Sequence, residues 1–381
     1  MAITRARILW RPIVAVAAGA TLFTTVQGLS YPLLAVILYR RGAAETFIGF
    51  NTAMTPLGMI LAAPIATVLM RRIGGLALAA GSICGAVLCL LLIAAINDPW
   101  TWMPLRLFQG LSLACLFVVT DTWVNQLAPA HARGRVLGFY SMLTSVGFAL
   151  GPALLLMVGT QGWAPFLAGA ACGLLSLVPL IMSRADLPPR DAAPSQSILA
   201  FSPLAPVLLA GAAAAALADQ AAMSMLPIFT LRYGMDVSAS NFTLIVMVAG
   251  SIGLQYPIGW LAEHVPQRAL YAGCALTTAA GAALMPIAVH APFVFWLVVF
   301  IWGGAYYAIY TLSLVRLGER YRGAALIAGN AAFAAMWGAG GLLGTPAIGA
   351  AMQLWGPIGL SIVLAGLFVV LGITTLVVSD A

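Results

Sequence analysis

Two charged side chains lie inside long apolar stretches of this sequence. Asp219 occurs in ALADQAAMSMLP and Arg106 in PLRLFQG. A charge at the centre of a membrane helix costs on the order of 2.5–3.5 kcal/mol on the insertion scale, so such residues face a bundle interior or a water-filled cavity. We therefore expect both side chains to line a polar cavity between helices.

These two charges allow several kinds of chemistry. Asp219 can carry a proton, bind a cationic solute, or hold two helices together through a hydrogen bond. Arg106 can bind an anionic group, attract the partner of a coupling ion, tie helices together, or extend towards the membrane surface. The sequence alone leaves these alternatives open.

Uncharged polar residues in the other apolar stretches are further candidates for this cavity. Each of them either lines the cavity or bonds one helix to another. They are Gln27, Tyr31, Asn51, Gln109, Gln255, Tyr256, Tyr306, Tyr310 and Asn330. Met223 and Met225 lie close to Asp219, but thioethers without His or Cys partners are poor evidence for a metal site. We therefore predict no metal and no cofactor.

No catalytic constellation accompanies these residues. The three histidines, His131, His264 and His290, fall between apolar stretches. The sequence has neither a G-x-S-x-G elbow nor a phosphate-binding G-x-x-x-x-G-K loop, and it has no lysine. The sequence therefore predicts that the protein is neither an enzyme nor an ATP-driven pump.

The composition indicates a membrane protein. Hydrophobic residues make up 62% of the 381 residues and charged residues 7%, with a mean hydropathy of +1.04. A soluble domain is about a quarter charged. Because about 20 apolar residues cross a bilayer, the chain supplies roughly twelve crossings. The predicted spans are 12–38, 46–70, 76–96, 102–126, 136–159, 163–183, 204–230, 239–262, 269–289, 292–315, 324–350 and 356–378.

A polar segment in the middle of the chain separates six spans from six. It begins at Arg184 and reads RADLPPRDAAPSQS, a composition typical of a linker. We predict an all-α membrane protein with two pseudo-symmetric six-helix bundles, residues 1–183 and 204–381, joined by a linker at 184–203. Parallel six-helix repeats are one known design of transporters, with the substrate site at the repeat interface.

The basic residues, all arginine, fall mostly on one side of the predicted spans. Only Arg40, Arg41 and Arg232 lie on the opposite side of the membrane. Cytoplasmic loops carry the excess of basic residues. We therefore place both termini and the linker in the cytoplasm. The net charge of +7 then reflects topology and not a nucleic-acid surface.

Two loop motifs resemble those of the major facilitator superfamily, and the resemblance covers essentially the whole chain. The family's loop motif is G-x-L-A-D-R-x-G-R-R. GWLAEHVPQR at 259–268 matches it, with Glu263 at the acidic position and Arg268 at a basic one, while TVLMRRIGG at 67–75 is a weaker copy. The resemblance implies the twelve-helix major facilitator fold in a bacterial inner membrane.

Two helix motifs also resemble this superfamily. RLFQG supplies Arg106, Gln109 and Gly110 in the R-x-x-Q-G pattern of its helix 4. GFALGP matches G-x-x-x-G-P, a pattern that in this superfamily is associated with antiporters, especially drug-efflux members. It places Gly147 and Gly151 on one helix face and is followed by a bend at Pro152. That face can act as a pivot between the halves or can simply pack a neighbouring helix.

Charged residues at the predicted cytoplasmic ends of the helices can form ion pairs that close the cytoplasmic side. We predict that Asp121 pairs with Arg71 or Arg72 when the cytoplasmic side is closed, with Glu263 and Arg268 as the second-half counterparts. The alternative is that these arginines only mark the cytoplasmic side.

We expect a secondary transporter of a small organic solute that rocks its two bundles and uses protons as the coupling ion. Export of an amphipathic solute is preferred because of GFALGP and the aromatic cavity candidates. Proton-coupled uptake of a nutrient or metabolite is the alternative within transport. A membrane sensor or a lipid-handling protein is the alternative outside it. We expect a monomer in the bilayer, with no nucleic acid as partner.

Overall fold

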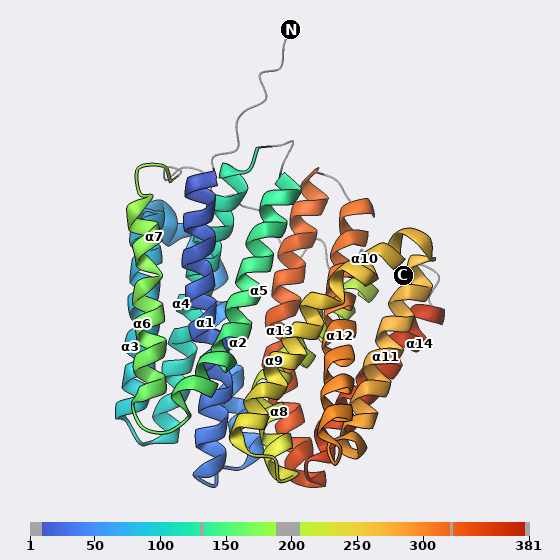
Figure 1. Ribbon diagram of the computed structural model, residues 1–381. Helices are drawn as coiled ribbons and strands as arrows, with labels where there is room; N and C mark the ends of the chain where they lie inside the picture. Colours follow the sequence, from blue (N-terminus) through green and yellow to red (C-terminus); the bar gives the residue numbers. More distant parts are fainter. Residues whose placement is uncertain (1–9, 130–132, 188–205, 321–322, 378–381) are drawn as a thin grey trace. The chain divides into compact units, whose positions relative to one another are not determined.

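The structure, a computed structural model, describes residues 10–129, 133–187, 206–320 and 323–377. Within these residues the chain forms fourteen helices and no strand (Figure 1). The first half contains α1 (Trp10–Arg40), α2 (Glu45–Ile73), α3 (Gly75–Ala95), α4 (Pro99–Leu127), α5 (Arg133–Val158), α6 (Ala164–Leu175) and α7 (Leu177–Met182). The second half contains α8 (Pro206–Arg232), α9 (Val237–Gly253), α10 (Gln255–His264), α11 (Gln267–Ala288), α12 (Pro292–Arg320), α13 (Gly323–Trp355) and α14 (Ile358–Val377).

The predicted spans coincide with these helices. In the described part of the chain, ten spans are long and apolar enough to cross a membrane, and α6 with α7 and α9 with α10 each form one of them. The helices α2 and α13, of 29 and 33 residues, occupy the second and eleventh predicted spans. The prediction of an all-α membrane protein is confirmed.

Several helices extend past their predicted ends, and α12 and α13 do so by five residues each. We expected spans ending at residues 315 and 350, whereas α12 continues to Arg320 and α13 to Trp355. An apolar run marks only the part of a helix inside the hydrocarbon, and backbone hydrogen bonds continue into the polar residues beyond it.

Local sequence sets several helix ends. Gly74 separates α2 from α3 at a φ of 89°, a conformation that glycine adopts readily. The helix α4 begins at Pro99 directly after Asp98, whose carboxylate accepts hydrogen bonds from the backbone N–H groups of Trp100 and Thr101. The hydrogen bond from the Thr101 hydroxyl, followed by these backbone bonds, lowers the pKa of Asp98.

Contacts between residues divide the chain into two compact units. The first unit contains residues 1–30 and 58–194, and the second contains residues 31–57 and 195–381. The segment 31–57 covers the end of α1 and the start of α2, and we call it the α1–α2 hairpin. The predicted bundle boundaries stay a prediction, and in this division the hairpin falls in the second unit. Most of the predicted linker, residues 188–203, lies outside the described residues.

In the first unit, α3 packs along α4 and α6. The unit's core contains large side chains from several helices, among them Phe23, Ile83, Trp123 and Leu180. Lipid tails are as apolar as these side chains, so helix association in a membrane depends on close packing and interhelical hydrogen bonds.

Small residues bring α1 directly against α5 in this unit. A Cβ atom at Gly147 would collide with Thr24, and one at Gly151 would collide with the backbone at Gly28. The Thr24 hydroxyl also donates to the backbone carbonyl of Thr144, at 3.0 Å. The two helices therefore touch backbone to backbone.

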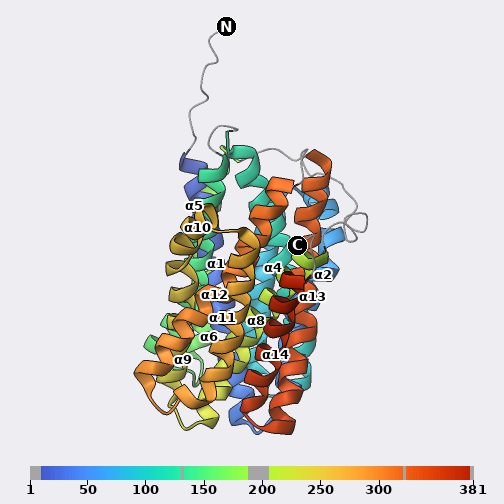
Figure 2. The same ribbon diagram turned by 90° about the vertical axis from the view of Figure 1, so that its right-hand side faces the viewer.

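In the second unit, α8 packs along α13, α9 along α12, and α14 against α11 and α13 (Figure 1, Figure 2). Side-chain hydrogen bonds connect neighbouring helices. Thr230 of α8 donates to Ser240 of α9 at 2.8 Å, and the hydroxyls of Tyr271 and Ser313 connect α11 to α12 at 3.1 Å. These contacts fix the rotation of each helix about its axis and thereby position the polar side chains of the site.

Candidate functional site

The acid predicted to be functional pairs with a tyrosine from another helix. Tyr306 of α12 donates its hydroxyl hydrogen to Oδ1 of Asp219 in α8, at 2.9 Å. Tyr306 is buried, whereas Asp219 is half-buried. Hydrogen bonds to a carboxylate are stronger than those between neutral groups. Both residues were candidates from the sequence, and the structure brings them together within one unit.

Aromatic rings continue from this pair along α12 and onto α13. Tyr306 contacts the rings of Trp302 and Tyr307, with centroid separations of 4.8 and 6.4 Å. Tyr310, another predicted candidate, lies 6.1 Å from Tyr307 and 4.8 Å from Trp337 of α13. The carboxylate of Asp219 is thus next to a continuous group of aromatic side chains.

The candidates of the first unit are buried. Arg106 is 1% exposed on α4, Gln109 lies one turn later on the same helix at 2%, and Gln27 of α1 is also 2% exposed. Burying a guanidinium costs free energy unless polar groups surround it. We therefore expect polar groups around Arg106 inside this unit. Arg106 and Asp219 belong to different units.

Two candidates lie on the α1–α2 hairpin. Tyr31 is 2% exposed and Asn51 is 0% exposed. In the part of the chain that the structure describes, the amide nitrogen and oxygen of Asn51 have no hydrogen-bond partner within the protein. A buried amide without partners is costly, so Asn51 is suited to bind water or a solute.

Gln255 lines a cavity of about 260 Å³ between α10, α11 and α12. Its Oε1 accepts a hydrogen bond from the Thr311 hydroxyl at 3.0 Å, and Gln267 lines the same cavity. Tyr256 is 84% exposed and does not line this cavity. The structure therefore does not bring Tyr256 to Asp219, and a cavity role for Tyr256 stays a prediction.

The predicted gating residues have other contacts in this structure. Arg268 at the start of α11 donates from Nε to the backbone carbonyl of Thr375 at 2.8 Å, and from Nη2 to that of Leu376. It thereby bonds the last carbonyls of α14, which are left unpaired at a helix end. Asp121 is exposed near the end of α4. Its backbone carbonyl accepts a hydrogen bond from the Asn125 amide at 2.9 Å.

The remaining gating candidates stay predictions. Arg71 and Arg72 are exposed in the last turn of α2. The glycine face formed by Gly147 and Gly151 is occupied by α1 of the same unit, and Pro152 lies buried in α5. The side chains of two candidates, Glu263 and Asn330, lie outside the described residues.

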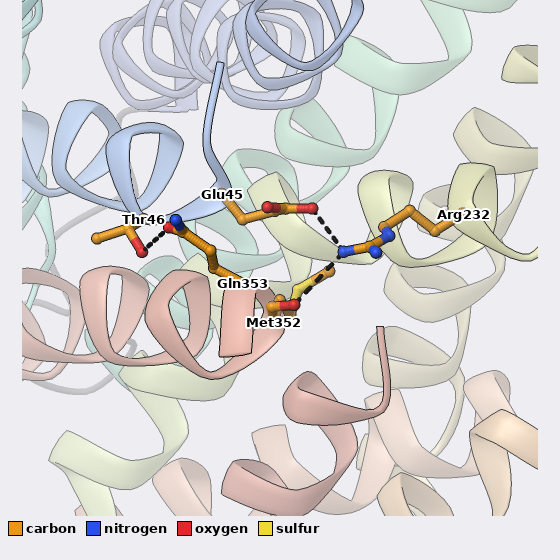
Figure 3. Close-up of polar contacts among 5 residues, drawn as sticks. All are labelled: Glu45, Thr46, Arg232, Met352 and Gln353. Carbon is orange, nitrogen blue, oxygen red and sulfur yellow. Dashed lines mark hydrogen bonds and ion pairs between the residues drawn. The ribbon is translucent and has the colours of Figure 1, made fainter. Parts of the chain in front are cut away.

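The structure adds contacts that we did not predict. Glu45 of α2 and Arg232 of α8 form an ion pair at 2.7 Å (Figure 3). A sequence signal for it existed, because both residues occur at ends of spans on the same predicted side of the membrane. Tyr307 and Trp337 also escaped the candidate list, since nothing in the sequence separates them from other aromatic residues in membrane helices.

Comparison with known proteins shows the family to which this chain belongs. A family model described as Major Facilitator Superfamily matches residues 16–330. The uncharacterized MFS-type transporter YfkF of Bacillus subtilis (strain 168) is 27% identical over 337 residues, which cover 86% of this chain and 85% of that protein. The uncharacterized MFS-type transporter YcaD of Salmonella typhimurium (strain LT2) is 26% identical over 250 residues, 64% of each protein.

Two solved structures are similar over nearly their full length. A crystal structure of the nucleoside transporter NupG has a TM-score of 0.76 at 12% identity, covering 96% of this chain and 98% of that one. A crystal structure of a D-xylose-proton symporter has a TM-score of 0.73 at 14% identity, covering 97% of each chain. At these identities the likeness shows the fold alone.

Proposed function

Because this chain belongs to the major facilitator superfamily, we propose that it is a proton-coupled secondary transporter of a small organic solute. As a multi-pass membrane protein of that superfamily, it is a transporter rather than an enzyme. In our proposal it lies in a bacterial inner membrane with both termini in the cytoplasm and works as a monomer. The bundles of residues 1–183 and 204–381 rock to expose the solute site alternately to the two sides.

One observation carries the coupling proposal, the hydrogen bond from Tyr306 to Asp219. The carboxylate lies within a membrane-spanning helix, where it can take a proton from one side and release it to the other. While Asp219 is ionised, the Tyr306 hydroxyl stabilises its charge. When a proton binds, that charge-assisted bond weakens, so protonation changes how α8 and α12 are held together.

Export of an amphipathic solute is the preferred direction. GFALGP and the aromatic group around Tyr306, Tyr310 and Trp337 support it, since aromatic faces suit apolar and cationic solutes. Uptake of a nutrient or metabolite is the second candidate, because a D-xylose-proton symporter shares the fold. In both directions the proposed coupling residue is the same.

Proteoliposomes with an imposed pH gradient and a panel of radiolabelled solutes test this proposal. We expect Asp219→Asn to reduce proton-driven accumulation at least about tenfold while solute exchange without a gradient continues. That loss corresponds to about 1.4 kcal/mol or more. Asp236→Asn is the matched control, because Asp236 caps α9 through the backbone N–H of Ala239 and asparagine caps equally well.

The other outcomes each have a distinct meaning. Loss of both accumulation and exchange in Asp219→Asn would make Asp219 a binding group for a cationic solute instead of a proton carrier. Wild-type accumulation at several pH values would leave it a purely structural hydrogen-bond acceptor. Wild-type protein that accumulates no solute of the panel would favour a sensor or lipid-handling protein.

A further inference from the structure

The helix pair α9 and α10 packs tightly on α12 along α9 and leaves space along α10. A Cβ atom at Gly250 of α9 would collide with the backbone carbonyl of Phe300 in α12. One at Gly304 of α12 would collide with the side chain of Leu254. At Gly259 of α10, in contrast, a Cβ atom would meet no atom within 4 Å. Close packing therefore ends at Leu254, and the cavity of about 260 Å³ begins beyond it.

A proline interrupts the helix at this point. Pro257 lacks the N–H group that would donate to the carbonyl of Gly253 in a continuous helix. The structure accordingly ends α9 at Gly253 and begins α10 at Gln255. Sharp kinks in helices occur mostly at such residues. The interruption lets α10 leave the surface of α12, and the cavity occupies the space between them.

The cavity lies where three membrane spans end. The spans that contribute to its lining are Val237–Ala262, Gln267–Ala288 and Pro292–Leu317. Among the lining residues, Ala262 and Gln267 are themselves span ends, and Val315 lies one helical turn or less from another. The ends of apolar spans lie at the level of the lipid headgroups. The cavity is therefore at the depth at which phospholipids carry their phosphate groups.

Gln255 offers a hydrogen-bond donor to this cavity. The Thr311 hydroxyl donates to Oε1 of Gln255 at 3.0 Å, so the amide nitrogen Nε2 is left for another acceptor. In the part of the chain that the structure describes, this Nε2 atom is buried and has no hydrogen-bond partner. A buried donor without an acceptor is costly. Gln255 is thus suited to bind an acceptor oxygen of a molecule in the cavity.

Positive charge lies beside the same cavity. Nε of Arg316 donates to Oε1 of Gln267 at 3.3 Å, and Gln267 lines the cavity. The Arg316 guanidinium also lies over the ring of Tyr271, 5.4 Å from its centroid, a contact that stabilises its position. Among the described residues the lining contains no carboxylate, and the side chains of Glu263 and Glu319 lie outside the description. An oxygen that carries negative charge therefore suits this site.

The remaining surface of the site is apolar and aromatic. The lining residues without a polar side chain are Ile258, Gly259, Ala262, Ala308, Leu312 and Val315. Beside the cavity on α10, Tyr256 is 84% exposed and Trp260 is 52% exposed. Tyr and Trp are enriched where the hydrocarbon meets the headgroups. A ligand with a charged phosphate and apolar chains matches both parts of the site.

We propose that the cavity between α10, α11 and α12 binds the phosphate group of an anionic phospholipid. Gln255 donates a hydrogen bond to it, Arg316 supplies positive charge, and the acyl chains lie outside along Tyr256 and Trp260. Pockets that enclose a whole drug-sized ligand have roughly 300–1,000 Å³, so about 260 Å³ admits the headgroup only. By the predicted orientation the cavity is on the cytoplasmic side, where basic pockets between membrane helices bind anionic headgroups. Lipid binding here needs no transported solute.

Native mass spectrometry of the purified, delipidated protein in detergent tests the ligand class. The added probes are phosphatidylglycerol, a diacylglycerol with the same acyl chains, and glycerol 3-phosphate. We expect phosphatidylglycerol to stay bound, diacylglycerol to be lost, and glycerol 3-phosphate neither to bind nor to displace the lipid. Equal retention of diacylglycerol would overturn recognition of the phosphate. Displacement by glycerol 3-phosphate would overturn a lipid as its source.

Two variants assign the binding to this cavity. Gln255→Glu replaces the donor by a carboxylate of nearly the same size. We expect it to weaken phosphatidylglycerol binding at least about tenfold, because hydrogen bonds to charged groups are among the stronger ones. Gly259→Leu fills part of the cavity without adding charge and should also weaken binding. It keeps the site testable if Gln255→Glu does not fold, which circular dichroism checks.

Gln161→Glu is the matched control for charge. It makes the same substitution at an exposed residue between α5 and α6, so the affinity for phosphatidylglycerol should not change. Arg316→Gln should reduce the preference for phosphatidylglycerol over zwitterionic phosphatidylcholine, while Arg316→Lys should retain it. Unchanged binding in folded Gln255→Glu and Gly259→Leu would overturn the site. So would an equal loss in Gln161→Glu, because repulsion by any added charge would then explain the result.

Discussion

The two ends of the second unit are packed in different ways. At the hairpin end, α2 and α13 touch backbone to backbone at Gly49 and Gly349, and an ion pair covers the contact. At the α10 end, residues of α10, α11 and α12 line a cavity of about 260 Å³. The hydrogen bond from Thr311 to Gln255 joins α12 to α10 beside this cavity. One end of the same unit is therefore closed while the other retains internal space.

Replacing a glycine by a larger residue should give the largest difference in stability between the two ends. Gly349→Leu has no room against the carbonyl of Glu45, whereas no atom lies within 4 Å of a Cβ at Gly259 in α10. We expect Gly349→Leu to lower the free energy of unfolding by about 1–3 kcal/mol. Gly259→Leu should change it by about 0.5 kcal/mol or less. Unfolding in detergent followed by circular dichroism measures both, and equal losses would show that the ends are packed alike.

Removal of a hydroxyl should give a smaller contrast. Thr345→Val loses the bond to the carbonyl of Gly49 in a fully buried contact, and we expect a loss of about 1 kcal/mol. Thr311→Val loses the bond to Gln255 beside the cavity, where water can replace the hydroxyl, so about 0.5 kcal/mol or less is expected. The same unfolding assay applies. A larger loss for Thr311→Val would mean that the cavity is dry.

Salt should produce the smallest effect and only at the hairpin end. The Glu45 and Arg232 side chains are partly exposed, so their attraction is screened as the Debye length falls from about 10 Å at 0.1 M to about 3 Å at 1 M salt. The difference in unfolding free energy between the wild type and Glu45→Gln should shrink by a few tenths of a kcal/mol. The difference between the wild type and Thr311→Val should stay constant, because no charge takes part in that bond.

The helices were predictable from the sequence because a bilayer imposes both length and polarity on each span. The same argument singled out Asp219, since an acid in an apolar helix is unusual whatever its neighbours are. Its partner was not predictable. Tyr306 was one of several aromatic candidates, and only the rotation of α12 about its axis, set by packing against α9, brings its hydroxyl to Asp219.

The hairpin contacts were missed for a different physical reason. The distribution of arginines was used to assign sides of the membrane, and Arg232 entered that argument as a charge without a partner. Its pairing with Glu45 depends on how residues 31–57 pack on the second unit. Glycines such as Gly49 and Gly349 are also uninformative alone, because glycine is frequent in membrane helices. Only the structure shows which backbone segment each of these glycines contacts.

The contact between α1 and α5 fixes the point about which the end of α1 can turn. The backbone of α1 rests on α5 as far as Gly28, so the helix cannot slide there unless the two backbones separate. A pivot at Pro32 leaves a lever of about nine residues, or about 14 Å, to the turn at Arg41. Rotating this lever by about 20°, the size of a sharp kink, moves its tip by about 5 Å. That travel exceeds the 2.7 Å between Glu45 and Arg232, but Glu45 lies on α2, so α2 must bend as well before the pair can part.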